Sequence, residues 1–148
     1  MEKKIDILLV EDDEVDVMNV KRAFKNAKII NTLHVAGNGQ EALDLLRGKR
    51  GTKITPLPRI VLLDINMPRM NGIEFLREIR KDPELRALSV FVLTTSNDDT
   101  DRFEAYQLNV AGYILKPVGV ESFMKALAQL QVYWQLIELP EPRKLGRV

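Results

Sequence analysis

Short apolar segments alternate with longer amphipathic ones along this chain. The apolar segments are rich in Ile, Leu and Val and mostly lack regular alternation with polar residues: they span residues 5–10, 32–36, 59–64, 89–94 and 111–115. This pattern is typical of parallel strands covered on both faces, because side chains on either face then lie in the interior. We therefore predict five buried strands.

The intervening segments carry apolar residues at helical spacing. In order along the chain, these residues are Val17, Val20, Phe24 and Ala27; Ala42, Leu43 and Leu46; Ile73, Phe75, Leu76 and Ile79; Phe103, Tyr106 and Leu108; and Val120, Phe123, Leu127, Leu130, Trp134 and Ile137. Asn38 and Asn71 are the expected N-caps of the second and third helices, and Glu74 is placed to complete a capping box after Asn71. We predict five helices, the fourth with the weakest pattern.

Five strand–helix units with short connections indicate one α/β domain over residues 1–148. Consecutive units of this kind require a parallel sheet with right-handed crossovers, which is a doubly wound arrangement. Ligands of such sheets bind beyond the carboxyl ends of the strands. Residues 48–58 and the tail 138–148 fall outside the plan, and we expect a solvated basic loop and a frayed terminus.

The composition excludes several classes of protein. The chain has 148 residues, enough for one domain with a substantial core, and no cysteine, so it has neither disulfides nor thiolate metal sites. Its 22 basic and 21 acidic residues nearly cancel, which argues against a general nucleic-acid or membrane surface. No apolar run approaches the roughly 20 residues of a membrane span. We expect a cytoplasmic protein that recognises its partners through local surfaces.

Acidic residues stand at the ends of two predicted strands. The run Glu11–Glu14 follows the first strand, and Asp64 ends the third. Carboxylates that meet at one sheet edge repel, and oxygen ligands without His or Cys favour a hard cation, above all Mg²⁺. The alternative is that the acidic run only charges the start of a helix, where negative side chains are favourable.

Asp64 is also a candidate nucleophile, because carboxylates accept phosphoryl groups as aspartyl phosphates. The transferred group carries negative charge on its equatorial oxygens, so catalysis needs a metal, an ammonium group and hydroxyl donors around it. Thr94 ends the fourth predicted strand and Lys116 follows the fifth. We expect these two side chains to be the donors.

The chain resembles the receiver domain of bacterial two-component response regulators. The resemblance rests on ILLVEDDE, VLLDINMPRMNG, VFVLTTS and GYILKP in this order, and covers residues 5–137. It implies a five-stranded sheet in the order 2-1-3-4-5 with five helices, and Asp64 as the phosphoacceptor. It also implies Mg²⁺ bound directly by Asp13, Asp64 and the carbonyl of Asn66, with Asp12 acting through water.

The resemblance further implies how the signal is received and passed on. Tyr113 matches the aromatic residue that turns inward on activation, and the bond between Lys116 and Pro117 is expected to be cis. A sensor histidine kinase would supply the phosphoryl group. Only about eleven residues follow the fifth helix, so we expect signalling through protein contacts. The chain is also similar to the stand-alone receivers of phytochrome kinases, which implies a homodimer through helix 4, strand 5 and helix 5.

Two other classes remain open at this point. A phosphatase of the haloacid dehalogenase type also uses an aspartate nucleophile, but it needs a second aspartate where this chain has Asn66. A flavodoxin-like cofactor binder needs a phosphate-binding loop after the first strand, and the acidic run would repel the phosphate. His34, the single histidine, is expected to be a core or edge residue of the second strand.

Overall fold

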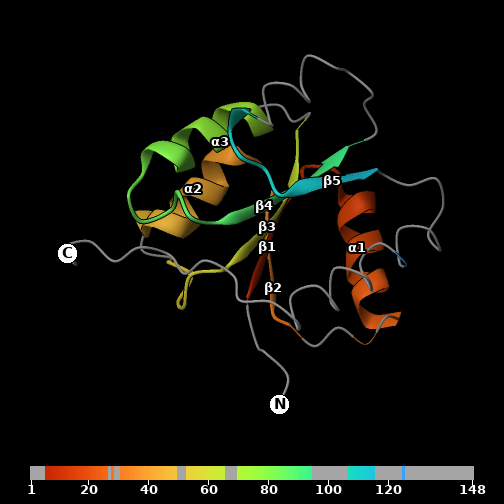
Figure 1. The fold of residues 1–148 in the computed structure, drawn as a ribbon. Helices are drawn as coiled ribbons and strands as arrows, with labels where there is room; N and C mark the ends of the chain where they lie inside the picture. The colour runs from red at the N-terminus through yellow and green to blue at the C-terminus, as the bar shows by residue number, and fades with distance from the viewer. Residues whose placement is uncertain are drawn as a thin grey trace.

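A computed structural model describes residues 6–26, 28, 31–49, 53–65, 70–94, 107–115 and 125. Its strands are β1 (Ile7–Val10), β2 (Leu33–Ala36), β3 (Ile60–Asp64), β4 (Ser89–Thr94) and β5 (Gly112–Leu115). All neighbours pair in parallel, and the order is β2-β1-β3-β4-β5. The five predicted strands, the fold class and the strand order are confirmed, and Figure 1 shows the resulting sheet.

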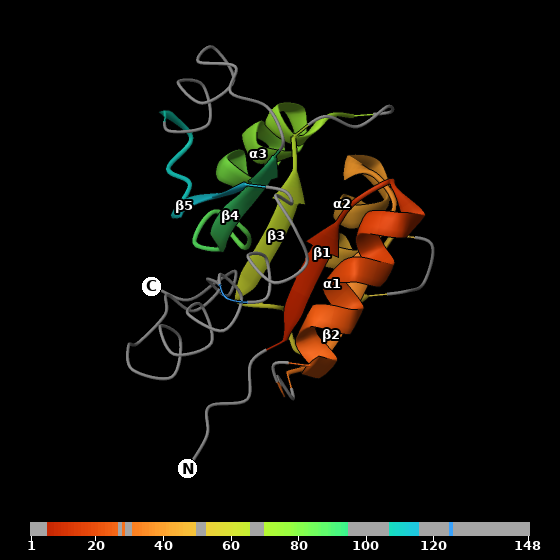
Figure 2. The same cartoon turned by 90° about the vertical axis from the view of Figure 1, so that its right-hand side faces the viewer.

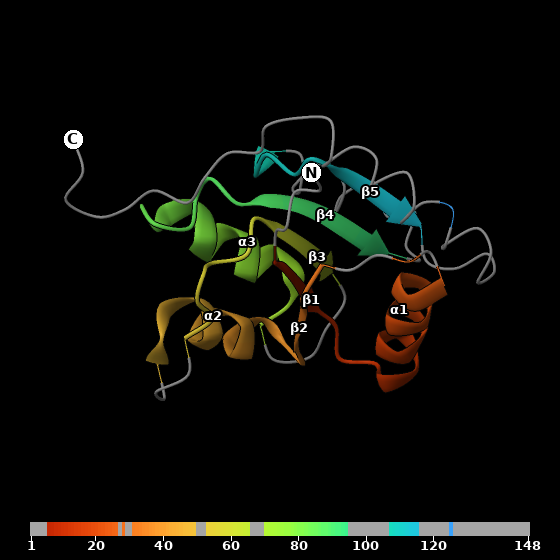
Figure 3. The same ribbon diagram turned by 90° about the horizontal axis from the view of Figure 1, so that it is seen from below.

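Helices cover both faces of this sheet. The described helices are α1 (Glu14–Asn26), α2 (Gly39–Arg47) and α3 (Gly72–Lys81). Figure 2 shows α1 in front of the sheet with α2 and α3 behind it, and the view from below in Figure 3 shows the same separation. The first three predicted helices are confirmed. The predicted fifth helix apart from Lys125 and most of the fourth, together with Ala27, Lys116 and Pro117, lie outside the described residues.

The strands are buried on both faces because they contribute to two separate cores. Leu8, Val10, Val61 and Leu63 belong to the core beneath α2 and α3. Their neighbours in sequence point the other way and pack beneath α1: they are Ile7, Leu9, Ile60 and Leu62. This explains the unbroken apolar runs in the sequence, since every strand position in the sheet centre has an interior to fill.

Both predicted N-caps are present. The Asn38 side chain accepts from the amide of Glu41 at 2.8 Å. Asn71 accepts from the amide of Glu74 at 3.0 Å, while the Glu74 carboxylate accepts from the Asn71 amide at 3.1 Å. This reciprocal pair is the predicted capping box. The caps fix where α2 and α3 begin at the carboxyl edge of the sheet.

In the loop at residues 48–58, the described residues 48–49 and 53–58 are less exposed than we expected, which corrects the prediction of a solvated loop there. Ile54 is only 6% exposed and belongs to the core beneath α2 and α3. Its amide donates to the carbonyl of Leu45 at 3.0 Å. Pro58 is also buried, while Lys49 and Lys53 are exposed. An apolar residue in the middle of a basic loop therefore anchors the loop to the end of α2.

Arg80 of α3 joins the turns that lead into β4 and β5. Its guanidinium donates to the carbonyls of Arg86 and Leu88 at 2.8 Å each, of Leu108 at 2.7 Å and of Asn109 at 3.1 Å. Burial lowers the pKa of Arg80, but an arginine stays charged at neutral pH even so. The amino ends of two strands are thus held by one cation.

Ion pairs connect further elements at places away from the acidic edge of the sheet. Arg47 at the end of α2 lies 3.0 Å from Asp82 and 3.8 Å from Glu78, which connects the far ends of α2 and α3. His34 lies on the edge strand β2, as predicted, and its Nε2 is 2.8 Å from Asp6 Oδ2. Within the described ranges, no helix is both long and apolar enough to cross a bilayer.

Candidate phosphoacceptor site

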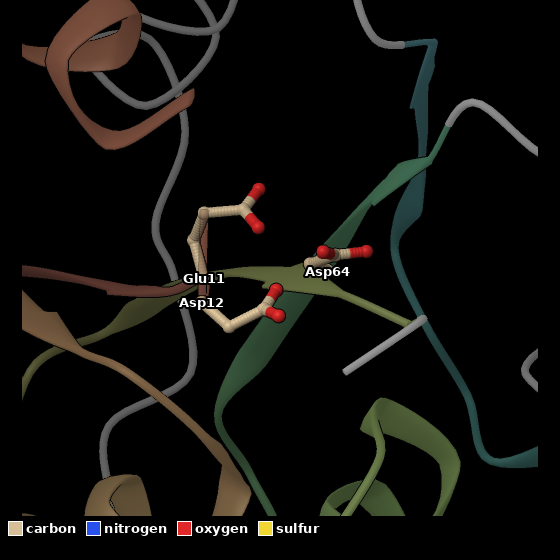
Figure 4. A group of neighbouring side chains, drawn as sticks. All are labelled: Glu11, Asp12 and Asp64. Atoms are coloured by element: carbon tan, nitrogen blue, oxygen red, sulfur yellow. The ribbon is translucent and has the colours of Figure 1, made fainter. Parts of the chain in front are cut away.

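The carboxyl ends of β1 and β3 bring three acidic side chains together. Glu11 directly follows β1, and its amide donates to the carbonyl of Ala36 at 2.9 Å, so the β1–β2 pairing continues through it. Asp12 comes next, and Asp64 is the last residue of the neighbouring β3. One carboxylate oxygen from each of Glu11, Asp12 and Asp64 lies within 4.8 Å of the others. Figure 4 shows these side chains.

The three carboxylates differ in exposure. Glu11 is 1% exposed and Asp64 is 6% exposed, whereas Asp12 is exposed to solvent. Two carboxylates about 4 Å apart repel by roughly 4 kcal/mol at an effective dielectric constant near 20. The donor set consists of carboxylate oxygens from both buried and exposed positions. It therefore fits a hard divalent cation such as Mg²⁺ or Mn²⁺, which prefers oxygen ligands and keeps several waters.

Asp13 has a different position from its neighbours. Its Oδ1 accepts from the amides of Val15 at 2.8 Å and Asp16 at 3.2 Å, and its carbonyl accepts from Val17 at 3.0 Å. These bonds make Asp13 the N-cap of α1. The acidic run therefore contains both arrangements that the sequence left open, a cluster at the sheet edge and a charged helix start.

Glu11 was not among the residues that we assigned to the metal, although it stands in the observed group. Its carboxylate also makes a local contact, since Glu11 Oε2 accepts from the Asp13 amide at 3.3 Å. The sequence does contain a signal, because Glu11 and Asp12 are the first two residues after Val10. A strand that stays paired through the next residue brings those two acids, rather than the following two, to the neighbouring strand end.

The chain after Asp64 returns to the sheet edge at Gly72. The Gly72 amide donates to the carbonyl of Ile65 at 2.9 Å. A Cβ atom on Gly72 would lie 2.6 Å from Ile65 Cα and 2.7 Å from the Asp64 carbonyl oxygen. No side chain fits there, so α3 begins directly against the backbone of the candidate nucleophile.

The other predicted site residues occupy β4 and β5 or lie outside the description. Thr94 is the last residue of β4, the strand beside β3, and pairs with Leu115 of β5. Tyr113 of β5 pairs with Val92 and packs, partly buried, against the core beneath α2 and α3. Asn66 and Lys116 fall outside the described residues, as does the side chain of Thr94.

Residues 7–128 match the response regulator receiver domain family. The chain belongs to this family. It is 38% identical over 128 residues to the probable methanogenesis regulatory protein FilR2 of Methanothrix harundinacea, covering 86% of this chain and 82% of that protein. It is 33% identical over 135 residues to the response regulator Rcp1 of a Synechocystis species, covering 90% and 92%.

Solved structures of receivers agree with the fold. The phosphorylated cyanobacterial phytochrome response regulator RcpA superimposes with a TM-score of 0.86 at 31% identity, covering 94% of this chain and 100% of that one. The Mn²⁺-bound form of Rcp1 gives a TM-score of 0.81 at 32% identity, covering 92% and 99%. This receiver is therefore a phosphoacceptor signalling protein, and not the phosphatase or the cofactor binder that the sequence left open.

Proposed function

We propose that this receiver accepts a phosphoryl group from a sensor histidine kinase onto Asp64, in the presence of Mg²⁺, and signals through contacts with other proteins. One observation carries the proposal: Asp64 ends a central strand within 4.8 Å of two further carboxylates. Without a cation, the three carboxylates repel one another. Beside a divalent cation, Asp64 is well placed to receive a phosphoryl group.

The residues proposed to hold the metal are Glu11, Asp12 and Asp64, with the carbonyl of Asn66. Mg²⁺ supplies charge neutralisation for the phosphoryl oxygens and for the carboxylates around it. The observed group supports moving the expected ligand set by one residue towards the amino terminus, because the Asp13 carboxylate is bonded to the start of α1. Rcp1 has been crystallised with Mn²⁺, which is consistent with a hard-cation site in a similar receiver.

The transfer itself requires one nucleophile and one leaving group. A carboxylate oxygen of Asp64 attacks the phosphorus atom, a new P–O bond forms, and the P–N bond to the histidine of the kinase breaks. The leaving imidazole keeps the electron pair and takes a proton. Thr94 and Lys116 are proposed to stabilise the phosphoryl oxygens, and Tyr113 is proposed to change position on β5 when Asp64 is modified. The cis geometry of the peptide bond between Lys116 and Pro117 stays a prediction.

We infer the partners from the family and from the signalling roles of similar proteins. Receivers partner with histidine kinases, and two similar structures are a phytochrome response regulator and the regulator RPA3017 in red light signalling of R. palustris. We propose a phytochrome-type kinase as the donor, and a homodimer through helix 4, β5 and helix 5 as one form of the readout.

Phosphorylation by a small acyl phosphate tests the site without a kinase. We expect intact-mass measurements to show one added phosphoryl group with Mg²⁺ present, none after chelation, and none in Asp64→Asn. Label without metal, or label retained in Asp64→Asn, would refute the assignment.

Paired variants test the ligand set. Calorimetric titration with Mn²⁺ is expected to show affinity lowered by at least about tenfold in Glu11→Gln and Asp12→Asn, and by much less in Asp13→Asn. If Asp13→Asn lowered the Mn²⁺ affinity more than Glu11→Gln, Asp13 and not Glu11 would be the metal ligand. Phosphotransfer from candidate kinases, including a phytochrome-type one, then identifies the donor.

A further inference from the structure

We propose that Gly39, the first residue of α2, is a positioning residue for the backbone at Asp64, and that it acts through Met70 and Gly72. A Cβ atom on Gly39 would lie 2.7 Å from the carbonyl oxygen of Met70 and 2.9 Å from its Cγ. Real Cβ atoms do not approach other atoms this closely, so α2 can meet Met70 only through a glycine. The inference rests on the function proposed for Asp64.

Met70 has an unusual backbone at this contact. Its φ is +52°, in the left-handed region that non-glycine residues rarely adopt. Such conformations persist where the surroundings impose them, and they concentrate at functional sites. Met70 is also partly buried and packs against the core beneath α2 and α3. Both its backbone and its side chain are therefore held.

The two sides of the contact are rigid because each belongs to a capped helix start. Gly39 follows Asn38, whose side chain accepts from the Glu41 amide, and the Glu41 carboxylate accepts from Gly37 at 3.1 Å. Met70 precedes Asn71, the N-cap in the capping box with Glu74. At the far ends, the ion pair of Arg47 with Asp82 connects α2 with the C-cap of α3.

Met70 is therefore separated from the backbone of Asp64 by only a few residues and contacts. Two residues beyond Met70, Gly72 donates to Ile65 at 2.9 Å and lies directly against the Asp64 carbonyl. The contact with Gly39 thus fixes Met70, and through Gly72 it supports the backbone of Asp64 and Ile65.

The test compares Gly39→Ala with Gln40→Ala, whose exposed side chain bonds only to Asp44 in the described structure. The first readout needs no metal: amide hydrogen exchange of Gly72, with the Gly48 amide as the internal reference. Gly48 donates to Asp44 at 2.9 Å at the other end of α2, far from Met70. In Gly39→Ala we expect faster exchange at Gly72 with little change at Gly48, and no change at either amide in Gln40→Ala.

The second readout is Mn²⁺ affinity by calorimetry. We expect binding weaker by about tenfold in Gly39→Ala, the range found when groups supporting a metal site are changed. The double variant Gly39→Ala with Met70→Gly should recover part of the loss, because it removes the Cγ contact at 2.9 Å and glycine adopts positive φ freely, whereas the carbonyl oxygen of residue 70 remains. Met70→Ala adds no clash, so it can be measured even if Gly39→Ala does not fold. In Met70→Ala we expect faster exchange at Gly72 than in the wild type, by less than in Gly39→Ala.

Equal exchange increases at Gly72 and Gly48, or unchanged Mn²⁺ affinity in folded Gly39→Ala, would overturn the inference. A double variant with Mn²⁺ affinity no better than that of Gly39→Ala would also overturn it, since removal of the Cγ contact and relief of the positive φ would then make no difference. Wild-type protein that bound no Mn²⁺ would refute the proposed function, whereas the exchange measurements on the metal-free protein would still decide the positioning role.

Discussion

The two ends of the sheet differ in how their charged side chains are arranged. At the amino ends of the strands, Arg80 donates to four backbone carbonyls, and His34 lies against Asp6. At the carboxyl ends, the chain gathers the like charges of Glu11, Asp12 and Asp64. The amino end pairs each charge within the protein, whereas the carboxyl end brings like charges together, which the proposed cation would neutralise.

The largest expected effect is at the amino end. Arg80→Met keeps most of the apolar stem but removes every donor, and we expect a loss of about 3 kcal/mol in the free energy of unfolding, because partly buried carbonyls lose their partners. Urea denaturation measures this loss. The control is Lys81→Met on the same helix, whose exposed ammonium pairs weakly with Glu78. Equal losses in the two variants would contradict a special role for Arg80.

Asp13 sharpens the contrast within the acidic run. Asp13→Ala removes the acceptor for the Val15 and Asp16 amides, and should lower the free energy of unfolding by about 1.5 kcal/mol. Asp13→Ser keeps an N-cap acceptor without the charge and should recover most of it. If serine were no better than alanine, Asp13 would act through its charge and not as a cap.

Replacement of Asp12 should change the free energy of unfolding in the opposite direction to replacement of Asp13. In metal-free solution, Asp12→Asn removes one of three like charges and is expected to raise the free energy of unfolding by about 1 kcal/mol. With saturating Mg²⁺, the wild type should gain stability through ligand binding and become the more stable protein. Thermal unfolding with and without Mg²⁺ measures both quantities. A destabilised metal-free Asp12→Asn would show that repulsion is not the dominant interaction there.

The smallest effect is expected at His34. The pair with Asp6 is partly exposed, with side chains 29% and 21% accessible, so His34→Ala should lower the free energy of unfolding by only about 0.5 kcal/mol. A loss as large as that of Arg80→Met would show that the edge strand β2 depends on this pair. The comparison separates one ion pair at the edge from a cation that serves four backbone carbonyls.

Local rules account for most of the fold that the sequence predicted. Asn38 and Asn71 were recognisable because an N-cap needs only its own side chain and an amide three residues later. The strands were recognisable because both faces of β1 and β3 are buried, which leaves unbroken apolar runs. Their predicted limits differ from the observed ones by no more than two residues.

The site was less predictable because it depends on single positions and on contacts between distant segments. The acidic cluster was expected, but whether Asp13 or Glu11 joins it depends on one additional pairing, from the Glu11 amide to Ala36. The contact of Gly39 with Met70 joins residues 31 positions apart in the chain, and no local pattern indicates it. Ile54 was missed because a lone apolar residue in a basic loop has no periodicity.

The pairing of β1 with both β2 and β3 has a consequence for synthesis of the chain. Residues 7–64 contain all three strands, so they can associate before β4 and β5 have left the ribosome. Each later strand then extends the same side of the sheet. Until Ser89 and its successors arrive, the hydrogen-bonding edge of β3 is open to any other strand. We expect nascent chains halted between β3 and β4 to be the ones that need chaperone protection most.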